Sequence, residues 1–459
     1  MLADVAGAPP ARNAEPDASR ELGRTVWSLA WPVIASLLSE AAVGLVDALM
    51  VGRLGRDAVA AVGVGTQILG SVSVVTAAVG TATMALVARH IGAGEIGMAR
   101  RVAGQSLVAA FGLASLAIVP VLVWTAGVVR LFGVEPAVVE LSVAFTRVIL
   151  LAIPGGALLF VVGSTLRATG DTRTPLAIGL VVNVVNVVLN YVLIFGAFGA
   201  PALGVRGSAL ASAIAFTTGA AIGIVLLARG DLGMQVGRAD LRWDRGIMMR
   251  LARIGTPAGI EMFAMQMGFL LYLVFAGIYG TAAVAAYFIG VRILALSFLP
   301  GIGFATAAAT MVGQNLGAGA LDRAEESGRV AMRMAVRHMS AAGLVFLVFA
   351  TPIARLFVDD AAVIEDTRWF IYMLGLCQPL MAVDYALGGA LRGAGDTRFP
   401  LLTLFVGLYG CRLAFAWLVT HVLGLSLPWL WAALIGDYAA RAALKTWRYR
   451  SRAWQRVRV

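Results

Sequence analysis

The sequence predicts an all-α integral membrane protein of twelve transmembrane helices, arranged as two parallel six-helix repeats. Its 459 residues are 60% hydrophobic and 13% charged, which is more apolar surface than a soluble core of this length could bury. Apolar stretches long enough to cross a bilayer recur between short charged or Gly/Pro-marked breaks. In addition, segments 166–175 (LRATGDTRTP) and 391–400 (LRGAGDTRFP) are nearly identical.

These two segments lie 225 positions apart, and the same offset relates Pro32 to Pro257 and Gly92 to Gly317 without a gap. The chain is therefore a duplication. Because each half holds an even number of spans, both halves start on the same side of the membrane, so a pseudo-two-fold axis along the membrane normal should relate them. We expect two six-helix bundles that face each other across a cleft.

Taken in order along the chain, each span is an apolar stretch that ends at such a break. In the first half we expect spans at 27–50, 60–88, 102–126, 138–163, 175–198 and 207–228. In the second half we expect them at 255–278, 283–311, 335–352, 369–390, 399–420 and 427–443. The two cysteines, Cys377 and Cys411, fall within spans and are interpreted as packing residues.

The spans divide the chain into five parts. Residues 1–24 are polar and lack the order of a signal peptide, so we expect a disordered cytoplasmic tail. Residues 25–228 form the N-lobe and 254–443 the C-lobe, joined by a charged cytoplasmic linker at 229–253. Residues 444–459 form a basic cytoplasmic tail, and the basic run 441–458, which includes Lys445, is interpreted as a membrane-surface anchor.

The net charge of +11 invites a nucleic-acid interpretation, but the positions of the basic residues argue against it. Most of the 36 Lys and Arg residues fall in the two tails and the even-numbered loops, and few lie in the odd-numbered loops. That distribution is the positive-inside pattern. We therefore expect a multi-pass protein of the plasma membrane with both termini in the cytoplasm.

The duplicated motif is interpreted as a helix-to-helix turn on the inner face, either a hinge or an ion-paired clamp, and not as a substrate site. Its glycines suit positive φ, its aspartates suit capping, and its prolines suit the start of the next span. The residues concerned are Arg167, Gly170 and Asp171 in the first copy, and Arg392, Gly395 and Asp396 in the second.

Four acids fall within or near the expected spans, where a charged side chain costs about 2.5–3.5 kcal/mol and needs a reason to be present. Glu40 and Asp47 are seven residues apart on one helical face. Asn183, Asn186 and Asn190 also share one face, and we expect both faces to line a polar cavity in the N-lobe. A proton and a cationic compound would compete for one acid there.

Structural alternatives remain open for each of these residues. Asp47 could be a buried structural acid, and the asparagines could either hold the Asp47 carboxyl group or bond helix to helix. Asp384, the main acid of the C-lobe, could pair with Arg412 or Arg292. Glu261 is expected near the inner membrane interface.

The 225-residue offset pairs none of these acids with another acid. Asp47 corresponds to Tyr272, and Asp384 corresponds to Leu159. The two lobes are therefore predicted to share a scaffold and to differ in chemistry.

Several segments together resemble the multidrug and toxic compound extrusion (MATE) family. They are 46–55 (VDALMVGRLG), the paired LRxxGDTR turns, 186–196 (NVVLNYVLIFG) and 311–319 (MVGQNLGAG), and the similarity is closest to the DinF-like branch. The resemblance implies an antiporter that exports amphipathic, often cationic compounds in exchange for H⁺ or Na⁺. It also implies that Asp47 is the coupling acid, while Asn190 stands where the DinF-like pattern often has an acid.

The resemblance further implies small-molecule substrates, the lipid bilayer as partner, no cofactor besides the coupling ion, and no catalysis. We expect a monomer that binds no metal and no nucleic acid.

Two rival functions make different demands on the sequence. A lipid-linked saccharide flippase would need a strongly cationic cavity, and a polyprenyl transferase would need clustered Asp or His on a loop near lipid phosphate. The only adjacent aspartates, Asp359 and Asp360, are expected on the extracytoplasmic side.

Overall fold

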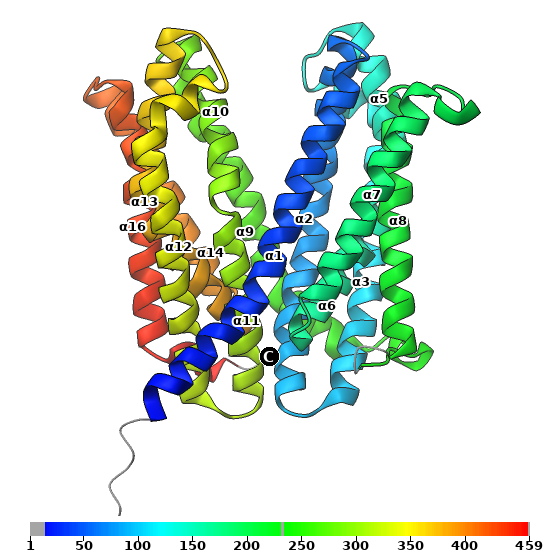
Figure 1. Ribbon diagram of the computed structural model, residues 1–459, viewed down its shortest axis with the longest axis vertical. Helices are drawn as coiled ribbons and strands as arrows, with labels where there is room; N and C mark the ends of the chain where they lie inside the picture. Colours follow the sequence, from blue (N-terminus) through cyan, green and yellow to red (C-terminus); the bar gives the residue numbers. More distant parts are fainter. Residues whose placement is uncertain (1–13, 231–233, 458–459) are drawn as a thin grey trace, which may run out of the picture.

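The computed structural model describes residues 14–230 and 234–457, and this part of the chain is helical with no strand (Figure 1). The first repeat contains α1 (Ala14–Gly52), α2 (Arg56–Gly92), α3 (Ile96–Val123), α4 (Thr125–Arg130), α5 (Pro136–Leu150), α6 (Ile153–Thr169), α7 (Arg173–Phe195), η1 (Ala197–Gly199) and α8 (Val205–Arg229). A short 3₁₀ helix in the linker, η2 (Arg238–Leu241), separates the repeats.

The second repeat contains α9 (Arg245–Gly277), α10 (Thr281–Ser297), α11 (Leu299–Gly317), α12 (Leu321–Arg355), α13 (Ala361–Gly393), α14 (Arg398–Leu404), η3 (Phe405–Leu413), α15 (Ala414–Trp417), η4 (Leu418–Val422), α16 (Leu427–Arg450) and η5 (Ala453–Arg456). Here η3 and η4 are π-helical, and together with α14 and α15 they form one continuous span.

The helices agree with the predicted twelve spans. In the described residues, ten segments are long and apolar enough to cross a membrane, and α5 with α6, bent by 46°, makes an eleventh. The twelfth is α16, which has sufficient length with 24 residues but carries Asp437, Arg441 and Lys445. These three charged side chains are buried.

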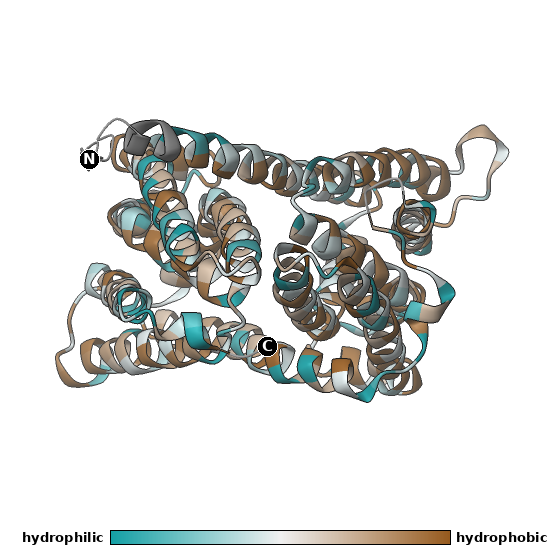
Figure 2. Cartoon of the chain, turned by 90° about the horizontal axis from the view of Figure 1, so that it is seen from below, coloured by the Kyte–Doolittle hydropathy of each residue, from teal (hydrophilic) through white to brown (hydrophobic). Residues whose placement is uncertain are grey.

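The helices form two lobes that diverge toward the top of Figure 1, and both ends of the described chain lie at the bottom. We call the part of the molecule at the top of Figure 1 its upper end and the part at the bottom its lower end. Seen from below, the lobes lie side by side, and hydrophobic residues predominate along most of the helices (Figure 2). Each lobe has its own large apolar core.

Two long helices change lobe along their length. The lower half of α1 contributes Val26 and Ala30 to the core of the C-lobe, whereas Val51 near its upper end packs in the N-lobe. Conversely, α9 places Leu251 in the N-lobe core and Tyr272 in the C-lobe core. Figure 1 shows α1 crossing from the lower left to the upper right. The lobe limits 25–228 and 254–443 therefore describe the other helices better than they describe α1 and α9.

The lower ends of α2 and α11 meet through glycines in a symmetric contact. A side chain on Gly92 would collide with the backbone carbonyl of Gln314, and one on Gly317 would collide with that of Arg89. Both pairs are related by the offset of 225 residues. Between them, Ala88 faces Gly313, its own equivalent in the other repeat. The pseudo-two-fold axis therefore passes between these two residues.

The tails and the linker differ from expectation in three respects. Helix α1 begins at Ala14, so residues 14–24 of the expected disordered tail are helical, whereas 1–13 lie outside the described residues. Of the linker, residues 245–253 belong to α9. Gln105 of α3 donates to the Asp240 carbonyl at 3.0 Å and holds this part of the linker against α3. Residues 231–233 of the linker are not described.

The third difference concerns the basic tail. Helix α16 extends to Arg450, and Arg441 and Lys445 are buried within the C-lobe instead of anchoring the chain at the membrane surface. They are buried because an acidic partner on α13 faces them. Only the part of the run beyond this pair remains compatible with a surface role.

Candidate functional site

The Asp47 carboxylate lies against the asparagine face of α7, as the spacing of these residues predicts. The Asn190 Nδ2 donates to Asp47 Oδ1 at 2.5 Å. In the amide orientation of Asn186 that gives both of its polar atoms a partner, Nδ2 lies 3.0 Å and 3.2 Å from the two Asp47 oxygens, and Oδ1 accepts from the Ser212 hydroxyl at 3.1 Å. Two amides thus hold one carboxylate, and α8 holds one of the amides.

Burial makes these contacts consequential. Asn190 is fully buried, Asn186 is 6% exposed, and Asp47 itself is half-buried. An amide donor that loses its acceptor in such a place costs about 1–3 kcal/mol. The Asp47 side chain is therefore held in position while part of it stays open to a ligand.

The other predicted residues of the N-lobe lie further down the same two helices. Asn183 donates to the Ser39 hydroxyl at 2.7 Å, which joins α7 to α1. Glu40 is exposed and accepts from Ser36 on its own helix at 3.5 Å. Arg167 on α6 is the main opposite charge that acts on Glu40, although no ion pair between the two is present among the described residues. Asp47 and Glu40 thus share a helix but have separate partners.

Asp384 lies in the other lobe, in a buried ion cluster. Its carboxylate accepts from Arg441 Nη2 at 2.7 Å and from Lys445 Nζ at 2.5 Å, and it is 1% exposed. Its partners are therefore these two residues of α16, and not Arg412 or Arg292. Arg412 pairs instead with Asp437 at 2.6 Å.

This cluster of Asp384, Asp437, Arg412, Arg441 and Lys445 contains three bases and two acids in the described residues. Spacings of four residues put Asp437, Arg441 and Lys445 on one face of α16, and this spacing was the sequence signal from which the cluster could have been found. Glu261 lies 2.6 Å from Arg392 at the lower end of α13, and its placement at the membrane interface stays a prediction. Glu261, Asp384 and Asp437 are therefore each neutralised by a basic side chain of the second repeat.

The duplicated motif forms the predicted turns. Gly170 and Gly395 adopt positive φ values of 95° and 86°. Asp171 Oδ1 accepts from the backbone N–H groups of Arg173 and Thr174, both at 3.0 Å, and so caps α7. In the second copy, Asp396 pairs with Arg448 at 2.8 Å.

The first turn also joins the lobes at the lower end. Thr310 of α11 donates to the Arg167 carbonyl at 2.9 Å, and Gln314 donates to the Ala168 carbonyl at 2.8 Å. Together with the glycine contact between α2 and α11, these bonds hold the two lobes together at the end where both termini lie.

Comparisons with known proteins agree with this architecture. The MatE family model matches twice, at residues 32–192 and 257–418, one match per repeat. A probable multidrug resistance protein NorM of Burkholderia mallei is 32% identical over 456 residues, which cover 97% of this chain and 95% of that protein. A probable multidrug resistance protein NorM of Thermotoga maritima is 29% identical over 96% of this chain and 94% of that protein.

Solved structures share the fold. A crystal structure of the Vibrio cholerae MATE transporter VcmN in its bent form superposes with a TM-score of 0.87 at 24% identity, covering 96% of this chain and 99% of that one. A MOP superfamily transporter from Pyrococcus furiosus gives 0.88 at 23% identity, covering 95% and 97%. The placement in the DinF-like branch stays a prediction. The two family matches span both repeats of the duplicated bundle, and the chain belongs to the MATE family of membrane transporters.

Proposed function

We propose that this protein is a secondary active multidrug efflux antiporter, which exports amphipathic cationic compounds in exchange for H⁺ by alternating access, with Na⁺ as the alternative ion. The observation that carries the proposal is the half-buried Asp47 carboxylate held by Asn190 and Asn186. Support also comes from relatives whose names describe multidrug resistance. The remaining residues of the predicted cavity, Glu40 and Asn183, would lie along the same path.

Exchange follows from competition for one carboxylate. The ionised Asp47 attracts a cationic compound, and the amide donors around it stabilise that ionised form. When a proton or Na⁺ binds, the negative charge is neutralised and the attraction for the compound is lost. Because the acid serves either the ion or the compound, movement of one down its gradient drives the other in the opposite direction.

The paired state of Asp384 supports a coupling site centred in the N-lobe. Arg441 and Lys445 already occupy both of its oxygens, so an external cation would have to displace a buried base. We propose that Asp384 contributes to transport through the stability of the C-lobe, while Asp47 binds the coupling ion.

Helix α1 offers a physical link between ion binding and the movement of the lobes. Asp47 lies in its upper, N-lobe half, while Trp27 in its lower half stacks on His338 of the C-lobe with ring centroids 5.1 Å apart. A shift of α1 that follows the charge state of Asp47 would therefore reach both lobes. With the positive-inside orientation, the lobes are joined on the cytoplasmic side, so we infer an outward-facing arrangement with both termini in the cytoplasm.

Dye efflux in everted membrane vesicles with an imposed pH gradient tests the proposal. The wild type should transport ethidium, and Asp47→Asn should lose the pH-driven component. Asp57→Asn is a matched control, because Asp57 lies ten residues further along with a side chain 44% exposed outside the network. Proton-driven transport that persists in Asp47→Asn would refute the assigned role, and repeating the assay with a Na⁺ gradient identifies the ion.

A lipid-linked saccharide flippase remains the alternative function. Such a protein needs cationic groups facing its cavity to hold a pyrophosphate, whereas an acid and amides gather around Asp47. Proteoliposomes that contain a fluorescent polyprenyl-pyrophosphate saccharide distinguish the two functions. Movement of this lipid without export of cationic dye would favour the flippase.

A further inference from the structure

A basic pocket lies at the lower end of the C-lobe, away from Asp47. It encloses about 570 Å³. Its walls come from the first turns of α9, the second copy of the duplicated turn, the end of α16 and the chain beyond it. Five arginines line it: Arg250, Arg253, Arg398, Arg448 and Arg456.

These arginines carry more charge than the pocket balances. The one carboxylate of the lining, Asp396, pairs with Arg448 at 2.8 Å. None of the other four arginines forms an ion pair within residues 14–230 and 234–457. The pocket thus presents unbalanced guanidinium groups, which suit the oxygens of a phosphate.

An apolar wall continues the pocket toward the bilayer. Phe399 and Leu402 line this wall. Both lie in α14, the first helix of its membrane span, and Leu402 is 53% exposed. Beside them, Trp447 is 62% exposed, with its ring 6.1 Å from that of Phe399. Tryptophan just beyond the end of a membrane span is typical of the membrane interface. A ligand here meets arginine on one side and hydrocarbon on the other.

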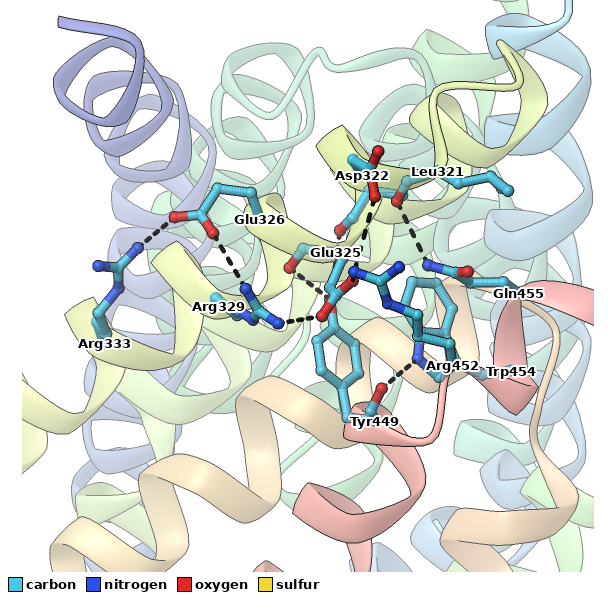
Figure 3. A network of polar contacts seen from close by, with 11 residues as sticks. Leu321, Asp322, Glu325, Glu326, Arg329, Arg333, Tyr449, Arg452, Trp454 and Gln455 are labelled. Atoms are coloured by element: carbon cyan, nitrogen blue, oxygen red, sulfur yellow. Dashed lines mark hydrogen bonds and ion pairs between the residues drawn. The ribbon is translucent and has the colours of Figure 1, made fainter. Parts of the chain in front are cut away.

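The C-terminal segment, residues 451–457, is held in place by a network on α12, so Arg456 and Val457 are fixed parts of the pocket. Arg452 contacts the buried Glu325 carboxylate at 2.6 Å, and Trp454 stacks on Tyr449 with ring centroids 4.8 Å apart. Figure 3 shows these residues with Leu321, Asp322, Glu326, Arg329, Arg333 and Gln455.

The same segment reaches the N-lobe. Arg89 at the lower end of α2 donates to the Val457 carbonyl at 3.3 Å. The C-terminal segment therefore links the pocket, whose lining residues all follow the first repeat in sequence, to helix α2 of the first repeat.

We propose that this pocket binds the phosphate group of an anionic phospholipid of the adjacent leaflet, with the acyl chains lying along Phe399 and Leu402. Free inorganic phosphate shares the chemistry recognised by the arginines. The apolar wall, which a free anion would not use, favours the lipid. This inference does not rest on the proposed function.

Thermal denaturation in detergent micelles, with phosphatidylglycerol, phosphatidylcholine or inorganic phosphate added at equal concentration, tests the proposal. Phosphatidylglycerol should raise the denaturation midpoint of the wild type, and native mass spectrometry should detect one retained phosphatidylglycerol. In Arg398→Gln/Arg456→Gln the apparent affinity should fall about thirty-fold, roughly 2 kcal/mol at 1.4 kcal/mol per factor of ten.

Arg101→Gln/Arg242→Gln is the matched control. It removes the same charge from two exposed arginines near the lower end that do not line the pocket, and it should keep the effect. If the first double variant does not fold, Arg253→Gln replaces it, because Arg253 is exposed and lines the pocket. Equal loss in test and control variants would overturn the proposal, as would an equal response to phosphatidylcholine. A phosphate response that the pocket variant alone abolishes would replace the lipid with a free anion.

Discussion

Replacing Gly92 with alanine should weaken the contact that joins the lobes at their lower end. A Cβ at this position would lie 2.6 Å and 2.7 Å from the Gln314 carbonyl carbon and Cα, and the neighbour is backbone that no rotamer change can move. Ordinary contacts between carbon atoms need about 3.5–4.0 Å. Helices α2 and α11 must therefore separate by roughly 1 Å in the variant.

The magnitude follows from overpacking at a close helix contact. Such insertions cost about 1–3 kcal/mol. That cost applies to the arrangement in which the lower ends touch, and it disappears when they part. A bias of about 2 kcal/mol changes a two-state ratio roughly thirty-fold, which is enough to populate a minor conformation. We expect Gly92→Ala to shift the protein toward a state with separated lower ends.

Pulsed electron paramagnetic resonance can measure this shift. Spin labels would be attached at Arg101→Cys in α3 and Asp322→Cys in α12, in a background that lacks the two native cysteines. Both positions are exposed, and they lie at the lower ends of different lobes. Gly92→Ala should add a longer distance between the labels, and Gly317→Ala should do the same, because its Cβ would meet the Arg89 carbonyl.

Gly97→Ala is the control, since nothing lies within 4 Å of a Cβ at that position. Its distance distribution should match that of the unsubstituted protein. An unchanged distribution in both Gly92→Ala and Gly317→Ala, in protein that remains folded, would refute the reasoning.

Three further predictions concern the buried contacts. Asp384→Asn should destabilise the protein by about 3–5 kcal/mol in thermal denaturation, because it leaves the buried Arg441 and Lys445 without their carboxylate, and adding Lys445→Met should recover part of the loss; additive losses would contradict this. Asn190→Ala should lower proton-driven dye efflux more than Asn183→Ala, since Asn190 donates to Asp47 and Asn183 to a serine; equal effects would count against the network. Trp454→Ala should cost about 3–5 kcal/mol and speed proteolysis of the C-terminal segment, and unchanged proteolysis would show that the segment is held otherwise.

The sequence predicted the features that depend on local pattern. Span lengths gave the twelve helices, and the offset of 225 residues gave the parallel repeats. Helical spacing brought Asp47 to Asn186 and Asn190, because residues three or four apart share one face. The serine that completes this network, Ser212, was missed, since a single hydroxyl in an apolar span has no distinctive pattern.

Features that depend on packing between distant helices could not be predicted. Nothing in α1 or α9 indicates that each helix changes lobe halfway along. The partners of Asp384 were missed because Arg441 and Lys445 stand near the basic end of the chain, where positive charge usually marks the membrane surface. Their spacing of four residues from Asp437 was visible, but its meaning required knowing that this face of α16 packs on α13.

The symmetric glycine contact between α2 and α11 has an evolutionary consequence. Gly92 touching Gln314, Gly317 touching Arg89, and Ala88 facing its own equivalent are the pairings of an isologous interface, in which two copies of one surface meet about a two-fold axis. The half-length ancestor would thus have associated as a homodimer, in which every substitution was made twice. Fusion of the two genes removed that constraint. An acid could then arise at position 47 while its counterpart became Tyr272, and one subunit interface became an internal contact of a single chain with two unlike sides.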